Sequence, residues 1–199
     1  MTTNKGEQET PTAVFDPTKL ETVNAGKDYP MEPEDFKKLF HHNCYCEMAH
    51  INKKGFPIVT PMFYVVRNEE VWVSSIRKHR HKVMELEQNP KVSVCIHNDG
   101  ANLRHQKAIL VIGHAEVSSD DTVMREIHWA ILDKYWSEVK GEEQRQTAFN
   151  AIHTPLRAVI RIVPDKTLNW DFGKMVDAYT PGVWYNEAYE LSKRLTQPG

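Results

Sequence analysis

The chain has 199 residues, of which 40% are hydrophobic and 26% are charged, and its formal net charge is −2. This length suits one well-formed core, and the composition is ordinary for a soluble globular protein. The slightly acidic balance disfavours a general nucleic-acid binder, which is usually basic. No apolar run approaches the roughly 20 residues of a membrane helix, and the start, MTTNKGEQETPT, lacks the apolar segment of a secretory signal. The three cysteines show no disulfide-framework spacing, which favours a reducing, cytoplasmic compartment.

Composition divides the chain into three parts. Residues 1–30 are polar and predict an N-terminal arm that is partly disordered, with one docked segment near 14–20. Residues 31–178 carry the regular hydrophobic patterns of one folded domain. Residues 179–199 form a tail rich in aromatic residues, which we expect to pack on the domain or on a dimer, with 186–194 as a short helix.

Hydrophobic periodicity predicts mostly short strands separated by turn residues. The strand centred on 107–117 is apolar almost throughout, so we expect it to be buried on both faces. Gly55 lies where a hairpin turn requires a positive φ. In chain order we expect a helix at 35–42, strands at 44–51, 56–66 and 71–75, a helix at 81–88 with Val83, Met84 and Leu86 facing inward, strands at 91–97 and 107–117, helices at 120–139 and 142–152, and strands at 157–163 and 167–171.

Three prolines interrupt the predicted strands. Proline donates no hydrogen bond to a strand ladder, so Pro57 and Pro61 belong at a sheet edge or a bulge. Pro61 therefore predicts a place where the sheet opens. We expect Pro164 to separate the last two strands.

These elements predict an α+β fold that is mainly β: a small, partly split antiparallel barrel with peripheral helices. A barrel of this size fills its interior with side chains, so a ligand must lie in a groove outside it. A groove on a small domain is usually completed by a second copy, which predicts a homodimer.

A cluster of hydroxyl and basic side chains precedes the helix expected at 81–88. It contains Ser74, Ser75, Arg77, Lys78, Arg80 and Lys82. A dianionic phosphate requires several hydrogen bonds and one or two cations, and a helix start adds N–H donors and a favourable dipole. The cluster therefore predicts a phosphate site, and the alternative interpretation is a solvated basic turn.

Four segments together carry a resemblance to a known family. They are GFPIVTPMFYV at 55–65, VWVSS at 71–75 followed by Arg80, Lys82 and NPKV at 89–92, AILVIGHAEV at 108–117, and RIVPDKTLNWDFGKM at 161–175. Their order and spacing resemble the flavin-binding split-barrel proteins related to pyridoxamine 5′-phosphate oxidase.

The resemblance implies a role for each matching residue. It implies that the isoalloxazine ring lies along Val59, Thr60, Pro61 and Met62, and that Ser74 and Ser75 meet the ribityl chain and phosphate. It further implies that Arg80 and Lys82 clamp the phosphate with Arg77 within reach, and that Trp170 and Lys174 approach the groove from the partner subunit. The elbow between Ser75 and Lys82 is about one residue longer than the family pattern, which leaves Arg77, Arg80 and Lys82 as alternative phosphate contacts.

The function that the resemblance implies is hydride transfer between a reduced donor and a small organic acceptor, with FMN as cofactor. The alternatives are a deazaflavin-dependent reductase, in which Lys53, Lys54 and Arg77 serve a longer anionic tail, and a non-catalytic flavin- or haem-binding module using His79 or His114. A structural dimer with an empty groove is a third possibility. No nucleophile–base set is visible, so no catalytic residue is named and the cofactor supplies the chemistry. Oxidation of pyridoxamine phosphate itself is disfavoured, because a second phosphate site and an arginine-rich ending are missing.

Other conspicuous residues have simpler interpretations. His41, His42, Cys44 and Cys46 match no tetrahedral metal spacing, and we expect the two cysteines to pack as small apolar residues on one strand face. Trp129 and Trp136, one heptad apart, are interpreted as core or interface residues. Residues 155–161 are interpreted as structural.

Overall fold

The computed structural model describes residues 25–77, 81–98 and 105–179. In this part of the chain, seven strands form one antiparallel sheet in the order β2-β1-β5-β6-β7-β4-β3. The strands are β1 (Cys46–Ile51), β2 (Pro57–Met62), β3 (Tyr64–Arg67), β4 (Glu70–Ile76), β5 (Lys91–His97), β6 (Lys107–Ser118) and β7 (Arg157–Asp171). The helices are α1 (Ala25–Asp28), α2 (Pro33–His42), α3 (His81–Gln88), α4 (Asp121–Tyr135), α5 (Glu142–Ile152) and α6 (Phe172–Tyr179).

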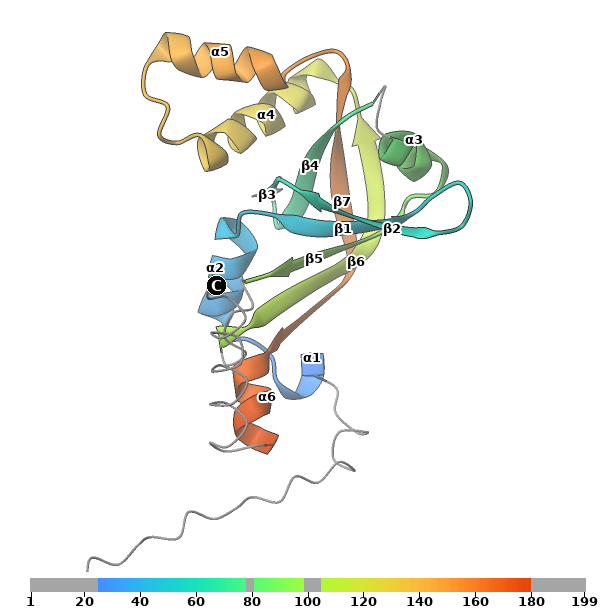
Figure 1. Cartoon of the computed structure of the whole chain (residues 1–199), viewed down its shortest axis with the longest axis vertical. Coiled ribbons are helices and arrows are strands. Elements are labelled where there is room, and N and C mark those ends of the chain that lie inside the picture. The colour runs from blue at the N-terminus through green and yellow to red at the C-terminus, as the bar shows by residue number, and fades with distance from the viewer. Residues whose placement is uncertain (1–24, 78–80, 99–104, 180–199) are drawn as a thin grey trace, which may run out of the picture.

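The two edges of the sheet are neighbours in the chain. Strand β2 is one edge, β3 is the other, and only Phe63 lies between them. The sheet must therefore curl until its edges approach each other, and Figure 1 shows this half-barrel with α3, α2 and the α4–α5 pair around it. Pro57 and Pro61, expected at a sheet edge or a bulge, lie in an edge strand, since β2 pairs only with β1 among the described strands.

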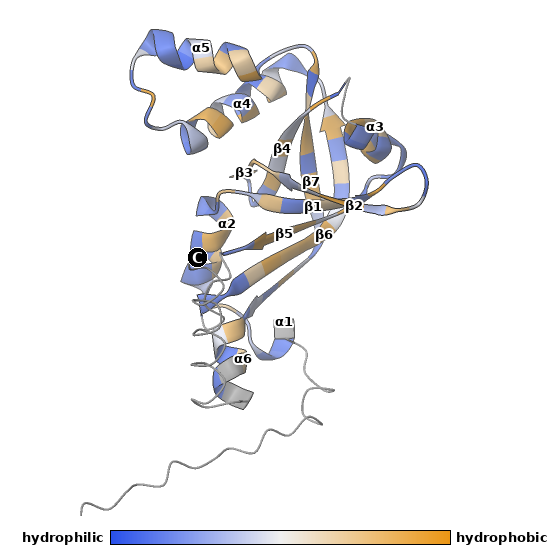
Figure 2. Cartoon of the chain, in the orientation of Figure 1, coloured by the Kyte–Doolittle hydropathy of each residue, from blue (hydrophilic) through white to orange (hydrophobic). Residues whose placement is uncertain are grey.

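The inside of the curled sheet forms the main core. Its largest fully buried side chains include Tyr64, Met48, Ile96 and Ile160. The Tyr64 hydroxyl donates a hydrogen bond to the Phe40 carbonyl at 2.8 Å, which fixes α2 against the barrel. Figure 2 shows the contrast between the hydrophobic strand β5 and the hydrophilic turn that joins β1 to β2.

Helix α4 builds a second core on the outer face of β3, β4 and β7. It starts at the N-cap Asp120, whose carboxylate accepts a hydrogen bond from the Val123 N–H at 3.0 Å. The Tyr135 hydroxyl near its end bonds both backbone groups of Tyr64, accepting from N–H at 2.9 Å and donating to C=O at 2.8 Å. The buried members of this second core are Val65, Met124, Ile127, Ala130, Ile131 and Val159.

Two strand predictions need correction. The strand expected over 56–66 is divided at Phe63 into β2 and β3. The break expected at Pro164 is wrong, because β7 runs from Arg157 to Asp171 without interruption. A register shift between Ile112 and Gly113 of β6 accommodates the proline within the ladder, where Pro164 lies opposite Gly113.

Several burial predictions also need correction. Met84, expected to face inward, is 41% exposed, and Ile112 is 38% exposed, so β6 is not buried on both faces. Cys46 is buried as expected, but Cys44 precedes the strand and is exposed. The helix expected to reach 139 ends at Tyr135. The expected segments at 14–20 and 186–194 lie outside the described residues.

Candidate functional site

A groove lies where β1, β2 and the start of α3 meet, and we call it the α3 groove. Its volume is about 330 Å³. Helix α3 begins at His81, and the side chains of His81 and Lys82 line the groove, so the positive end of the helix dipole lies beside it. The lining residues are His50, Asn52, Ile58, Thr60, His81, Lys82 and Glu85.

One wall of the α3 groove is a hydrogen bond between His50 and Glu85. The His50 ring donates from Nε2 to the Glu85 Oε2 atom at 2.9 Å, and the His50 side chain is almost fully buried. The other carboxylate oxygen accepts from the Lys53 N–H at 3.3 Å. Burial acts to raise the pKa of Glu85, but the hydrogen bonds from His50 and Lys53 outweigh it and lower the pKa below its usual value. The carboxylate thus fastens α3 to the β1–β2 hairpin.

Three of the predicted cofactor residues meet at this groove. Thr60 and Lys82 both line it, and the Lys82 Nζ atom lies 3.1 Å from the Met62 Sδ atom. Thr60 and Met62 belong to β2, whereas Lys82 belongs to the first turn of α3 and follows Met62 by 20 residues. The contact places an ammonium group beside the strand that the family resemblance assigns to the flavin ring. Arg80, the other predicted phosphate clamp, lies outside the described residues.

The alternation of β2 separates the remaining predicted ring contacts from these. Val59 and Pro61 point to the other face of the strand, where Val59 is 63% exposed. As the edge strand, β2 also presents backbone groups that no described strand pairs, although Pro57 and Pro61 contribute no N–H. A flat ligand along this edge would meet backbone polar groups rather than one set of side chains.

The two serines of β4 face opposite ways. Ser75 is buried on the barrel side of the strand, whereas Ser74 faces α4 and its Oγ atom lies 2.8 Å from His128 Nε2. Arg77 pairs with Glu87, with Nη2 and Oε1 2.6 Å apart. Among the predicted phosphate residues that the structure describes, Ser75 faces the barrel, Ser74 faces α4, Arg77 pairs with α3 and Lys82 lines the α3 groove.

Trp170 and Lys174 lie at the other end of the molecule. The Trp170 ring packs against Phe172 with centroids 6.2 Å apart. The Lys174 ammonium donates to the Pro30 carbonyl at 2.8 Å and pairs with Glu32 at 2.6 Å, so it ties α6 to the segment before α2. Figure 1 shows α6 well separated from α3. One chain alone does not bring these two residues to the α3 groove.

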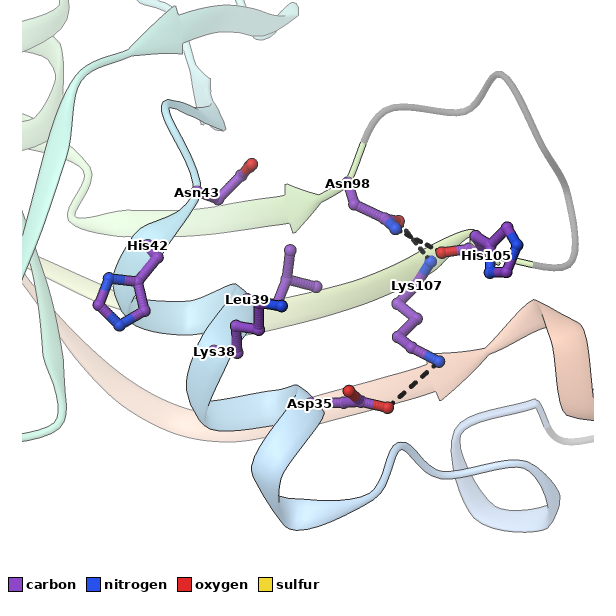
Figure 3. Close-up of a pocket in the computed structure, with 8 residues that line it drawn as sticks. All are labelled: Asp35, Lys38, Leu39, His42, Asn43, Asn98, His105 and Lys107. Atoms are coloured by element: carbon purple, nitrogen blue, oxygen red, sulfur yellow. Dashed lines mark hydrogen bonds and ion pairs between the residues drawn. The ribbon is translucent and has the colours of Figure 1, made fainter.

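A second pocket, which the sequence did not suggest, lies beside α2 and has a volume of about 350 Å³ (Figure 3). Its cation Lys107 is already neutralised, with Nζ 3.3 Å from Asp35 and 2.5 Å from Asp171. Burial alone would lower the pKa of Lys107, but the two carboxylates outweigh it and raise the pKa. The lining residues are Asp35, Lys38, Leu39, His42, Asn43, Asn98, His105 and Lys107.

The described residues contain no group of three or more His, Cys, Asp and Glu side chains placed to hold a metal ion. Burial raises the pKa of the Cys46 thiol to about 12, which keeps it protonated. His114, a candidate haem ligand, lies 3.4 Å from Asp165 at the surface. His79 lies outside the described residues.

The curled antiparallel sheet, split at one edge and covered by helices, is a split barrel. The sequence model of the pyridoxamine 5′-phosphate oxidase family matches residues 33–171, so the chain belongs to that family. No curated protein shows significant sequence similarity to it. In the described part of the chain, no helix combines the length and apolar character that crossing a membrane requires.

Solved structures share this fold at low sequence identity. The conserved hypothetical protein Rv2991 from Mycobacterium tuberculosis is 22% identical with a TM-score of 0.67, over 77% of this chain and 92% of that chain. An F420 reductase is 19% identical with a TM-score of 0.51, over 68% of this chain and 98% of that one. HutZ, the heme storage protein from Vibrio cholerae, is 17% identical with a TM-score of 0.54, over 67% of this chain and 90% of that one. These likenesses support the split-barrel fold.

Proposed function

We propose that this protein is a cytoplasmic oxidoreductase that binds FMN and transfers hydride between a reduced donor and a small organic acceptor. The observation that carries the proposal is the meeting of Thr60, Met62 and Lys82 at the α3 groove, beside the start of helix α3. A hydroxyl, an ammonium and a helix N-terminus are the groups that a flavin phosphate needs. Membership of the pyridoxamine 5′-phosphate oxidase family supports the same cofactor class.

Each part of the groove has a distinct task in this proposal. FMN, when bound, supplies the hydride chemistry. Lys82 neutralises phosphate charge, and Thr60 donates a hydrogen bond beside it. The unpaired backbone edge of β2 fixes the orientation of the ring, with Val59 and Pro61 offering an apolar surface. Arg77 contributes to phosphate binding only if it leaves Glu87.

The proposed enzyme is a homodimer. The exposed face of β2 and its flanks carries Phe56, Val59 and Phe63, large apolar side chains that a monomer would leave in water. A second copy would cover them. The same copy would supply Trp170 and Lys174, which one chain holds far from its own α3 groove.

Two other ligands have specific support. The fold of the F420 reductase, together with Lys53 and Lys54 at the hairpin tip beside the groove, favours a deazaflavin coenzyme with a longer anionic tail. The fold of HutZ favours haem in a non-catalytic module. Both share the scaffold with the FMN proposal and differ in what occupies the groove.

Titration of the purified apo-protein with FMN, with a deazaflavin coenzyme and with haem separates these proposals. Fluorescence reports the first two, and a Soret band reports the third. Tight FMN binding supports the oxidoreductase and directs a screen of acceptors with NADH and NADPH. Preference for the deazaflavin moves the function to a deazaflavin-dependent reductase, and binding of haem alone refutes the flavin proposal.

A further inference from the structure

A small cavity lies on the opposite side of β4 from the barrel interior, under helix α4, and we call it the α4 cavity. Its volume is about 150 Å³, and an engineered cavity of about that volume holds benzene. Its lining combines polar side chains with apolar ones, so a ligand here would carry one polar group on a small apolar body. The lining residues are Phe63, Ser74, His128, Ile131, Trp136, Ile152 and Arg157.

Arg157 gives the lining of the α4 cavity its positive charge. It pairs with Ile76 across β7 and β4, and Ser74 lies opposite Val159 two residues away, so Ser74 and Arg157 are diagonal neighbours on the face that meets α4. Within the described residues, no carboxylate pairs with the Arg157 guanidinium. Burial lowers the pKa of Arg157. A half-buried cation without an acid is costly, so an anion is the partner that this site lacks.

Arg161 lies on the same strand face and is paired with carboxylates. It lies four residues further along β7 and pairs with Glu70 at 2.6 Å and with Glu116 at 3.0 Å. Both arginines lie on the same face of β7, but among the described residues only Arg161 has carboxylate partners. Arg161 is therefore a matched control for Arg157.

A chain of hydrogen bonds links the α4 cavity to the surface. Ser74 Oγ lies 2.8 Å from His128 Nε2, His128 Nδ1 lies 3.1 Å from His153 Nδ1, and His153 Nε2 lies 3.0 Å from Asp121 Oδ1. His128 is fully buried, and burial, together with the nearby His153 and Arg157, lowers its pKa to about 4. His128 is therefore neutral near pH 7 and carries one ring proton.

The number of protons on the His128 and His153 rings fixes which group donates in each hydrogen bond of this chain. With both rings neutral, His153 Nε2–H donates to Asp121, His128 Nδ1–H donates to His153, and the Ser74 hydroxyl must donate to His128. The serine proton then points away from the cavity. If His153 takes up a second proton, it donates to both neighbours, His128 donates from Nε2 to Ser74, and the Ser74 proton becomes free to point into the cavity.

We propose that the α4 cavity binds a small organic carboxylate with an apolar body, held by Arg157 and the Ser74 hydroxyl, and that His153 takes up one proton as the carboxylate binds. The carboxylate accepts two hydrogen bonds from the guanidinium and one from Ser74. The apolar body contacts Ile131, Trp136 and Ile152. The site is separate from the α3 groove and does not depend on a flavin.

The groups around His153 set the direction of the pH dependence. On α4 it faces the Asp121 carboxylate and the neutral His128 ring, and Asp121 is shared with Arg125, whose Nη2 atom lies 3.5 Å from Oδ2. On its own helix it stacks on Phe149, and from β7 the Arg157 guanidinium acts on its neighbour His128. A carboxylate bound at Arg157 accepts the Ser74 hydrogen bond only when the chain has taken up the proton that frees the Ser74 hydroxyl. Binding is therefore tighter at lower pH.

Calorimetric titration of the full chain with benzoate, and with its neutral isostere benzamide, tests the proposal at about pH 6 and about pH 8. We expect benzoate to bind at least about tenfold more tightly than benzamide and more tightly at the lower pH. Two buffers of different ionisation enthalpy should report uptake of about one proton per benzoate. Equal binding of the two probes, or failure of benzoate to bind, would overturn the carboxylate site.

Variants assign the effect to the named residues. Arg157→Gln should reduce benzoate affinity by at least about tenfold, while Arg161→Gln should leave it unchanged. Because Arg157→Gln could impair folding, His153→Gln provides an independent readout: benzoate binding should lose its proton uptake and its pH dependence. Equal affinity in Arg157→Gln and Arg161→Gln contradicts the role of Arg157. Proton uptake that persists in His153→Gln contradicts the role of His153 in the chain of hydrogen bonds.

Discussion

The Nζ atom of Lys134 lies 3.7 Å from the centroid of the Tyr64 ring. That nitrogen is buried, and within the described residues it has no hydrogen-bond partner. The ring face attracts a cation, but it does not replace the hydrogen bonds that the ammonium loses on leaving water. Burial accordingly lowers the pKa of Lys134 from 10.5 to about 8.

Replacement of Lys134 with methionine should therefore stabilise the fold near neutral pH, by about 2 kcal/mol. Between the folded pKa of about 8 and the unfolded value of 10.5, the unfolded chain holds a proton that the folded chain has released. The stability of the wild-type protein should thus rise with pH across this interval. Urea denaturation at a series of pH values measures this rise, and Lys134→Met should lack it. The exposed Lys37→Met is the control, and identical pH profiles for all three proteins would contradict the prediction.

His128 should make the protein sensitive to acid. Its folded pKa of about 4 lies below the ordinary value of 6.5, so the unfolded chain takes up a proton first as the pH falls through this interval. Stability should therefore be full above pH 6.5 and fall towards pH 4, by up to about 1.4 kcal/mol per pH unit. Thermal denaturation of His128→Gln should show a shallower decline than the wild-type protein. The surface variant His114→Gln should retain the wild-type slope; an equally shallow slope in that variant would assign the effect elsewhere.

Lys82→Ala should weaken FMN binding by about 1.5–3 kcal/mol, the scale of a hydrogen bond to a charged group. The loss follows from removing the ammonium group beside Met62 and Thr60. Fluorescence titration measures the affinity, with the exposed Lys37→Ala as a control for net charge. Arg80→Ala should have a similar effect. Unchanged affinity in both Lys82→Ala and Arg80→Ala would show that the phosphate lies elsewhere.

Gly113→Ala should strongly destabilise the fold, by more than about 3 kcal/mol. A Cβ atom at this position would lie 2.0 Å from the carbonyl oxygen of Val163, a backbone atom of the paired strand. Gly55→Ala is the informative comparison, because nothing lies within 4 Å of its Cβ position and only its φ of +84° is unfavourable. That change should cost about 1–2 kcal/mol. Chemical denaturation of the two variants measures both effects, and similar losses would indicate that the strands separate easily at the bulge.

Elements could be predicted from the sequence where the residues that end them lie next to them in the chain. The helix at 81–88 was predicted with its observed bounds because Asn89 and Pro90 end it, and the strand at 91–97 follows directly. The expected break at Pro164 failed because its compensation lies on another strand, at the bulge beside Gly113. A proline therefore ends a strand only where no partner can adjust its register.

The residues of the candidate site likewise divide into those that the sequence could identify and those that depend on tertiary contacts. Lys82 could be found from local composition, since it lies in a contiguous cluster of hydroxyl and basic side chains, whereas Thr60 was implied by the family resemblance. Strict alternation along β4 would also have placed Ser74 and Ser75 on opposite faces. By contrast, His128 lies 54 positions after its partner Ser74, and it is the tertiary fold that brings Arg157 to the same cavity as both of them. Contacts of that kind leave no signal in a single sequence.

The split edge of this barrel is also protected against aggregation. An open sheet edge can recruit a strand from another chain, and the usual defences are prolines, very short edge strands and covering groups. Strand β2 contains Pro57 and Pro61, which offer no N–H donor, and β3 spans only Tyr64–Arg67. The Tyr135 hydroxyl occupies the backbone groups of Tyr64. The barrel can therefore remain split, and accessible to a ligand, without becoming a template for fibrils.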